Sequence, residues 1–358
     1  MKRLISALAV LAALVAVFGA GAPARAADDP SGAAQAALGW LLARQQADGS
    51  FAGFDAGASA DAVFAIVAVG SDPNGVLKNG SSPVSYLGTQ AASYAAKSPA
   101  AAGKLALAVV AAGKDPRNFG GQNLLQILLK TYNGQTGQYG ADITGHAYAL
   151  LALASAGQPI PPAAIAALEK SQLPDGGWSF DGSAATGSDT NTAALAVQAL
   201  VAAGAKGEPL GRALAYLKSQ QNADGGFPYS RASAFGTDSD ANSTAVVIQA
   251  LVAAGEDPRA LRRDADPVGA LLRLQNPSGA FRYQAALPDD NDLASAQAIP
   301  ALLLRPFPLK TTSLPAVQAP APAPASLPRT AGAPDAAWLA LLALALLAGG
   351  LALKPRGA

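Results

Sequence analysis

The sequence predicts an all-α protein whose central part is an α6/α6 toroid, with six helical hairpins in two concentric rings. Three features lead to this prediction: a motif that recurs five times, an apolar helical pattern after each copy, and no strand-like alternation long enough to compete. The chain of 358 residues then divides into a signal peptide (1–26), the toroid (27–304), a Pro/Ala-rich stalk (305–326) and an anchor (327–358).

The N-terminus has the features of a secretory signal peptide. Lys2 and Arg3 precede an apolar run at residues 4–18, and "ARA" at residues 24–26 offers the small residues that precede a cleavage site. An uncleaved membrane anchor is the alternative, but the run is short for a spanning helix. We therefore expect export and a mature chain that begins at Ala27.

The repeated motif closes one helical pattern in each copy. It has Gln or Asn six residues before an aromatic residue and Gly two residues before that aromatic, as in "WLLARQQADGSF" and "YLKSQQNADGGF". The amide residues are Gln45, Asn133, Gln172, Gln221 and Gln275, and the aromatic residues are Phe51, Tyr139, Trp178, Phe227 and Phe281. A sixth helix pair, at residues 85–116, lacks the Gly and the aromatic residue of this motif, which we call the corner.

A second helical pattern, rich in Ala, Val and Leu, follows each motif and ends in Gly, as in "LVAAGEDP" at residues 251–258. These helices are apolar around most of their circumference, which is typical of buried helices. The first helices carry charged or Gln side chains on one face. Six buried helices ringed by six amphipathic ones give the predicted toroid.

The motif resembles the QW motif of the squalene cyclase and prenyltransferase repeat superfamily. The likeness is carried by Trp40, Leu41, Gln45, Gly49 and Phe51 and by the other copies, over about residues 31–304. It implies a terpenoid cyclase-like toroid in which the Gln side chain ties helix ends together and the aromatic ring packs over the turn. The superfamily contains several unrelated activities, so the resemblance does not give the function.

The residues that carry catalysis in that superfamily are missing. Squalene cyclases use an Asp-x-Asp-Asp-Thr-Ala motif whose middle Asp donates a proton; this chain reads "DANSTA" there, and Asn242 cannot serve as an acid. The zinc of protein prenyltransferases needs Asp, Cys and His, but the chain has no Cys and one His. We predict no catalytic residue, no metal and no cofactor, with a terpenoid cyclase or prenyltransferase-type enzyme as the alternative.

Polar residues are expected to ring one mouth of the barrel, because all inner helices of a toroid point the same way. The candidate ligand-binding residues are Asp142, His146, Asp189, Asn191, Gln198, Asp240, Asn242, Gln249 and Asp292. Gln198 and Gln249 lie seven residues beyond Asn191 and Asn242, so each pair shares a helix face and extends a polar stripe inward.

These rim residues also have structural explanations. Asp and Asn are favoured N-caps, so capping alone accounts for one polar residue per helix. His146 is alternatively a hydrogen-bonded structural histidine. The acidic residues 289–292 could hold Ca²⁺ but lack the pattern of a defined calcium loop, and a solvated acidic loop is the alternative.

The C-terminal part predicts attachment to the cell envelope. Residues 305–326 form a Pro/Ala-rich stalk without apolar periodicity. The uncharged run 336–353 is long enough to span a bilayer, and Lys354 and Arg356 follow it. "LPRTA" at residues 327–331 resembles the cell-wall sorting signal read by sortases, with Ala331 in place of the usual Gly. A sortase is therefore an expected partner, and a plain membrane anchor is the alternative.

Composition narrows the remaining function classes. The absence of Cys excludes disulfides and thiolate metal sites, and a net charge of +1 without a basic run in the body gives no footprint for nucleic acid. We predict a surface-displayed toroid that binds a small or apolar ligand, or a partner, at the barrel mouth without catalysis. A structural or adhesion module is a further alternative.

Overall fold

The computed structural model describes residues 29–53, 55–232 and 236–309. The predicted signal peptide, the stalk beyond residue 309, and the predicted sorting signal and membrane helix lie outside this part of the chain. Within the described residues, no helix is long and apolar enough to cross a membrane.

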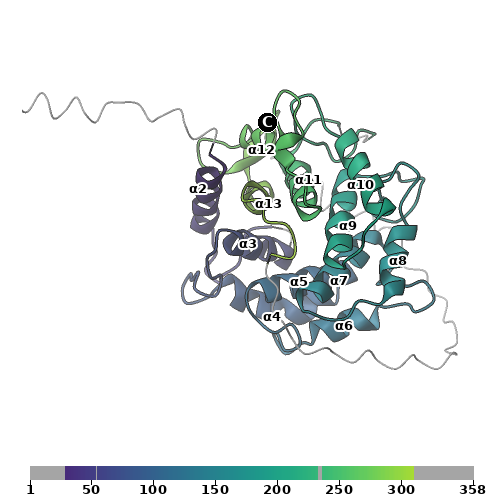
Figure 1. Ribbon diagram of the computed structural model, residues 1–358. Coiled ribbons are helices and arrows are strands. Elements are labelled where there is room, and N and C mark those ends of the chain that lie inside the picture. Colours follow the sequence, from purple (N-terminus) through teal and green to yellow (C-terminus); the bar gives the residue numbers. More distant parts are fainter. Residues whose placement is uncertain (1–28, 54, 233–235, 310–358) are drawn as a thin grey trace, which may run out of the picture.

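The described chain is predominantly helical, as predicted, and its helices alternate between two layers (Figure 1). The inner helices are α3 (Ala56–Ala68), α5 (Pro99–Ala111), α7 (Ile143–Ser155), α9 (Thr190–Ala202), α11 (Ala241–Ala253) and α13 (Asp292–Leu302). The outer helices are α2 (Pro30–Ala43), α4 (Pro83–Ala95), α6 (Leu124–Lys130), α8 (Pro162–Lys170), α10 (Glu208–Ser219) and α12 (Pro267–Leu272), with a short 3-10 helix, η2 (Pro258–Ala260), before α12.

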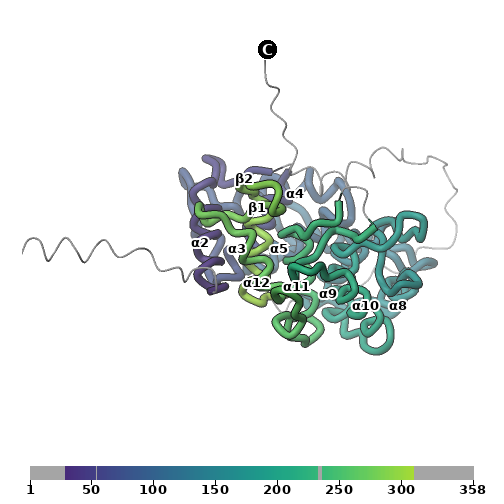
Figure 2. The backbone as a smooth tube through the Cα atoms, turned by 90° about the horizontal axis from the view of Figure 1, so that it is seen from above, coloured from purple at the N-terminus to yellow at the C-terminus, as the bar shows by residue number. Residues whose placement is uncertain are grey.

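The inner helices form a closed ring. Each contacts the next along the chain, from α3 through α5, α7, α9 and α11 to α13, and α13 contacts α3. The outer helices pack against them, and α2 packs on α13, so that the first and last helices of the domain are neighbours (Figures 1 and 2). The core is mainly Ala, Leu and Val, whose small or branched side chains let the inner helices approach closely.

Local sequence signals explain where the inner helices begin and end. A polar N-cap opens each one; Asp189, for example, accepts a hydrogen bond from the Thr192 N–H at 2.7 Å at the start of α9. The same helix ends just before Gly204, whose φ of 78° lies in the left-handed region that favours glycine.

The Gln of the repeated motif joins two neighbouring hairpins. Gln221 Nε2 donates to the Gly225 carbonyl at 3.0 Å and to the Leu261 carbonyl, ahead of the next outer helix, at 2.9 Å. Gln45, Gln172 and Gln275 make the same pair of bonds in their own units. Asn133 has a shorter side chain and instead accepts from N–H groups within its own turn.

The motif Gly and aromatic residue complete the corner. Gly225 has φ of 93°, and a Cβ there would collide with the Ala265 carbonyl oxygen of the next unit, so the close approach requires glycine. The corner aromatics Phe51, Tyr139, Trp178, Phe227 and Phe281 are all buried. Trp178 also donates its ring N–H to the Leu168 carbonyl at 2.8 Å.

A two-stranded hairpin departs from the all-helical prediction. β1 (Phe281–Gln284) pairs antiparallel with β2 (Leu287–Asn291) and packs against α13, near α2 at the edge of the ring (Figures 1 and 2). Most of β2 is exposed and includes Asp289 and Asp290, so it lacks the apolar alternation by which a strand is recognised in sequence. The predicted acidic loop is therefore the second strand of this hairpin.

Candidate functional site

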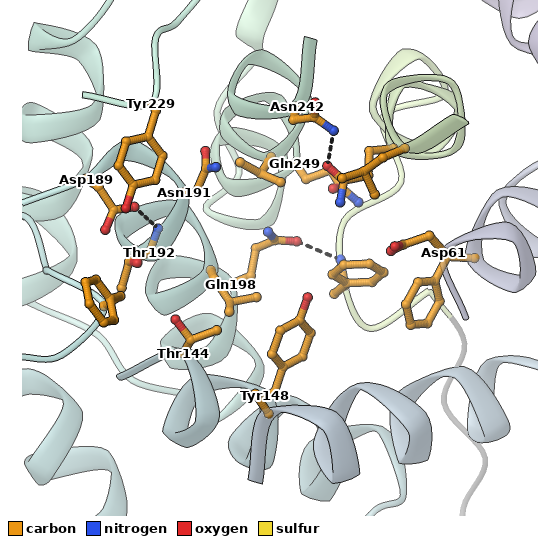
Figure 3. A pocket seen from close by; sticks show the side chains of 18 of the residues that line it. Asp61, Thr144, Tyr148, Asp189, Asn191, Thr192, Gln198, Tyr229, Asn242 and Gln249 are labelled. Carbon is orange, nitrogen blue, oxygen red and sulfur yellow. Dashed lines mark hydrogen bonds between the residues drawn. The ribbon is translucent and has the colours of Figure 1, made fainter. Parts of the chain in front are cut away.

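A cavity of about 140 Å³ lies inside the ring, walled by the inner helices and by the chain that follows α13 (Figure 3). Its polar lining includes Asp61, Asp142, Asp189, Asn191, Gln198, Asn242, Gln249 and Gln297, and its aromatic lining Phe64, Tyr148, Phe180, Tyr229 and Phe307. Six of the nine predicted rim residues line it: Asp142, Asp189, Asn191, Gln198, Asn242 and Gln249.

The aspartates Asp142, Asp189 and Asp240 are N-caps. Asp142 accepts from the Gly145 N–H at 2.6 Å, and Asp189 caps α9 in the same way. Asp240 caps α11 through the Ser243 N–H at 2.7 Å, and its second oxygen accepts from the Ser243 hydroxyl at 2.8 Å. Both Asp240 oxygens are thus occupied within its own helix, and Asp240 does not line the cavity, contrary to its predicted place at the rim.

The two deeper glutamines bind the chain's own backbone. Gln198 Oε1 accepts from the Phe307 N–H at 2.9 Å, and Gln249 Nε2 donates to the Arg305 carbonyl at 2.8 Å. The polar stripe predicted from the sequence thus exists, but its inner end holds residues 305–309. We call these residues the plug.

The plug closes one end of the cavity. Figure 1 shows the chain after α13 curving into the middle of the ring, where the Phe307 ring packs on Phe64 with centroids 4.7 Å apart. Phe307 and Leu309 are half-buried against the core. The predicted boundary between toroid and stalk at residue 305 is therefore wrong, since packing continues to Leu309; an irregular segment has no periodicity that would reveal this burial.

His146 faces away from the cavity. Its Nδ1 accepts from the Tyr139 N–H at 3.0 Å and its Nε2 lies 2.9 Å from the Ala164 carbonyl of α8, so the neutral ring donates there. Burial lowers the pKa of His146, which favours this neutral form. Ser59, Thr244 and Ser295 accept from the N–H of the corner aromatic in their own units, so His146 has the same structural role.

Asp292 likewise lies elsewhere than predicted. Its carboxylate forms a bidentate pair with Arg44, with Nε 2.8 Å and Nη2 3.2 Å from its two oxygens. Arg44 follows α2, so this ion pair links the last inner helix to the first outer helix at the protein surface. Asp292 is not among the cavity-lining residues.

The sequence did not predict a buried network of polar side chains on one wall of the cavity. Lys104 Nζ lies 2.7 Å from an Asp61 carboxylate oxygen, and Gln297 contacts Asp61 from α13. Gln297 Oε1 in turn accepts from Asn242 Nδ2 at 2.8 Å. Burial opposes the charge of Lys104, but the Asp61 carboxylate more than offsets this effect and keeps the pKa of Lys104 above its usual range.

Burial also changes the acidity of the caps. It raises the pKa of Asp189 to about 6 and that of Asp240 to about 7, while hydrogen bonds from the first turn of each helix oppose the shift. Burial raises the pKa of Asp142 as well. Protons therefore leave these carboxyls at higher pH than from exposed aspartates.

Two hydrogen-bond acceptors at the cavity have no partner. Asp189 Oδ2 and Asn191 Oδ1 are both buried, and neither receives a hydrogen bond from the part of the chain that the structure describes. The Tyr229 hydroxyl lies beside Asp189 and helps to oppose the rise in its pKa (Figure 3). Even so, Oδ2 receives no hydrogen bond from the described residues, so Oδ2 and Asn191 Oδ1 remain available as acceptors. Among the described residues, no group of three or more His, Cys, Asp or Glu side chains is arranged to hold a metal ion.

Comparison with known proteins identifies a fold. No protein-family model and no curated protein matches the chain. The type II terpene cyclase MstE from Scytonema, in its apo form, has a TM-score of 0.56 and 14% identity, and the match covers 77% of this chain and 98% of that one. An MstE variant has been solved with geranylgeranyl dihydroxybenzoate, named as its substrate, with a TM-score of 0.54, 14% identity and coverage of 79% and 98%.

Two further structures have similar folds. A protein from Actinoplanes matches with a TM-score of 0.52 and 18% identity, over 77% of this chain and 99% of that one. A variant of UGL, titled with dGlcA-Glc-Rha-Glc, matches with a TM-score of 0.52 and 13% identity, over 77% and 96%. At these identities the likeness shows a terpenoid cyclase-like fold alone.

Proposed function

We propose that the protein is a non-catalytic binding protein built as an α6/α6 toroid of six hairpins, and that it holds a small, largely apolar ligand in the cavity at the barrel mouth. The observation that carries this proposal is the pair of partnerless acceptors, Asp189 Oδ2 and Asn191 Oδ1, in a cavity with largely aromatic and aliphatic walls. Buried polar atoms are normally hydrogen-bonded, so a bound molecule would satisfy them.

The absence of catalysis is supported by the residues at the mouth. Asn242 stands where the resemblance to squalene cyclases places the proton donor, and its amide is bonded to Gln297. Asp240, the neighbouring carboxyl, accepts hydrogen bonds from Ser243 with both oxygens and does not line the cavity. No acidic proton from either residue is directed at a ligand in the cavity.

Native mass spectrometry of the purified full-length protein tests the binding function. A co-purified small molecule is expected, and denaturing the protein should release it. Replacing Asn191 and Asn242 together with Leu should weaken its binding by about 1–3 kcal/mol, because polar groups of the ligand then lose their partners. Gln126→Leu, on outer helix α6 and away from the cavity, is the matched control. Unchanged binding in the double variant would refute the proposed site.

A terpenoid cyclase or prenyltransferase-type enzyme is the second candidate, favoured by the likeness of fold to MstE. The cavity is comparable to one of about 150 Å³ known to hold benzene, and a geranylgeranyl chain is several times larger. We expect no cyclic product from geranylgeranyl dihydroxybenzoate or squalene, with or without Mg²⁺. A cyclic product detected by gas chromatography would overturn the non-catalytic assignment.

Surface display is a separate proposal, which rests on residues outside the described part of the chain. We propose export through the signal peptide 1–26 and attachment through residues 327–358. Deleting residues 331–358 should release the protein into the medium. If Thr330→Ala has no effect on attachment while the deletion does, the apolar helix is the anchor and a sortase is not involved. If the protein stays attached after the deletion, another of its surfaces contacts the cell envelope, as expected for the alternative role of a structural or adhesion module.

A further inference from the structure

We propose that the cavity is selective for a compact organic cation, a protonated amine on a short apolar body, whose ammonium group sits between Asp189 and Asn191. This inference rests on the proposed binding function and names the class of ligand for the same cavity.

Two buried acceptors at the cavity receive no hydrogen bond from the described residues. Asp189 Oδ1 is used by the cap of α9, but Oδ2 has no partner among the described residues, and neither has Asn191 Oδ1, two residues further along the chain. Asp189 is 97% buried, having 3% of its surface exposed. A ligand must therefore bring donors and no competing acceptors, and an ammonium group, with only donors, meets that need.

Carboxylates give the cavity lining a negative charge. Among the described residues, the cavity lining contains three carboxylates, Asp61, Asp142 and Asp189, and no Lys or Arg. The nearby Lys104 is already paired with Asp61 at 2.7 Å. A hydrogen bond from an ammonium to a carboxylate is stronger than one from a neutral donor, so Asp189 favours an amine over an alcohol.

The helix N-termini around the mouth act in the opposite direction, because the positive ends of their dipoles attract anions. However, Asp142, Asp189 and Asp240 already bind the first-turn N–H groups of α7, α9 and α11. An anionic ligand would have to displace these carboxylates while facing their charge. The capped mouth is therefore unfavourable for a phosphate or carboxylate.

Aromatic side chains form part of the cavity wall. Tyr229 stands beside Asp189 (Figure 3). Tyr148 and the Phe307–Phe64 pair line other parts of the same cavity. Aromatic faces attract ammonium groups and also pack against an apolar body. With the plug in place, the volume of about 140 Å³ limits that body to about the size of one benzene ring.

Isothermal titration calorimetry with three matched probes tests the inference on the full-length protein. Benzylamine, benzyl alcohol and benzoate share one ring and differ in charge. Benzylamine should bind about tenfold or more tightly than benzyl alcohol, and benzoate should not bind measurably. Asp189→Asn retains a capping oxygen and should bring the two affinities within about threefold. Asp292→Asn, which removes a carboxylate outside the cavity, should leave the tenfold preference intact.

The pH dependence gives a second readout. Benzylamine binding should strengthen as pH rises through about 6, because the pKa of Asp189 is about 6 and its carboxylate is the required acceptor. Among the described residues, the titratable groups that interact with Asp189 are Tyr229 and Tyr216, whose pKa values burial raises, and Asp61 and Asp142 are the other carboxyls that line the cavity. The tyrosines stay neutral in this range, and Asp189→Asn separates the Asp189 contribution from those of the other carboxyls.

The possible failures are distinguishable. Equal affinity for benzylamine and benzyl alcohol, or tighter binding of benzoate, overturns the inference about charge while the proposed binding function stands. Failure of all three probes to bind also overturns it. In that case, a co-purified molecule without a basic nitrogen, found by native mass spectrometry, would still support the binding function, and no co-purified molecule would count against both.

Discussion

Replacing Phe307 with Ala tests whether the plug is seated inside the ring in solution. The ring of Phe307 packs on Phe64 with centroids 4.7 Å apart and lies against the main core. Truncating a fully buried Phe costs about 3–5 kcal/mol. Because Phe307 is only half-buried, we expect a loss of about 2–3 kcal/mol, which includes about 1 kcal/mol for the aromatic pair. The backbone bond to Gln198 survives the substitution.

Urea unfolding followed by circular dichroism measures this loss. The slope of the unfolding free energy against urea concentration shows whether the variant exposes the same surface on unfolding as the wild type. Leu287→Ala is the matched control, since Leu287 is 42% exposed on β2 and its truncation should change stability by less than about 0.5 kcal/mol. A loss below about 0.5 kcal/mol for Phe307→Ala would show that residues 305–309 do not occupy the barrel. The plug would then not limit the size of the ligand either.

Three further predictions concern the caps and corners. Asp240→Asn keeps an N-cap but removes a carboxyl whose pKa is about 7 in the folded protein. This pKa lies above the value of about 4 in the unfolded chain. The stability of the wild type should therefore fall relative to that of the variant as pH rises from about 4 to about 7, by up to about 1.4 kcal/mol per pH unit. Thermal unfolding of both proteins at about pH 5 and about pH 8 measures this, and a constant difference would contradict it. Trp178→Ala should cost about 3–5 kcal/mol in urea unfolding, since the ring is fully buried and bonded to Leu168; a loss below about 1 kcal/mol would mean an open corner. Gln275→Leu should cost about 1–3 kcal/mol in the same assay, because the Ala33 and Gly279 carbonyls lose their hydrogen bonds from this side chain. An unchanged stability would show that the contact between the last and first hairpins does not depend on Gln275.

The helices and their corners could be predicted because their signals are local and repeated. A Gln four residues before a Gly and six before an aromatic residue returns at each corner, and in the structure that spacing lets one side chain reach both its own turn and the next hairpin, as Gln221 does. The same repetition could have corrected His146. His146 lies four residues after the cap Asp142, as Thr244 lies four after the cap Asp240, and both accept from a corner aromatic's N–H.

The rest of the site depends on contacts that no local pattern encodes. Asp61 and Lys104 are 43 positions apart and meet only because α3 and α5 are neighbours in the ring. Phe307 follows the last helix in a Pro-rich segment, where composition favours an extended linker. Its burial depends on Gln198, 109 positions earlier, and only the closed ring brings the two together.

The seam between the first and last helices has a consequence for how the chain folds. Gln275 and Ala33 are separated by 242 positions, and Arg44 and Asp292 by 248, so the bonds that join them close loops almost as long as the domain. Closing such a long loop lowers the entropy of the chain before the contacts that stabilise it have formed. The loop cannot close until the C-terminal hairpin has left the ribosome. During synthesis, the apolar face of α2 therefore has no α13 to cover it, and this early exposed surface is where a chaperone would bind or aggregation would start.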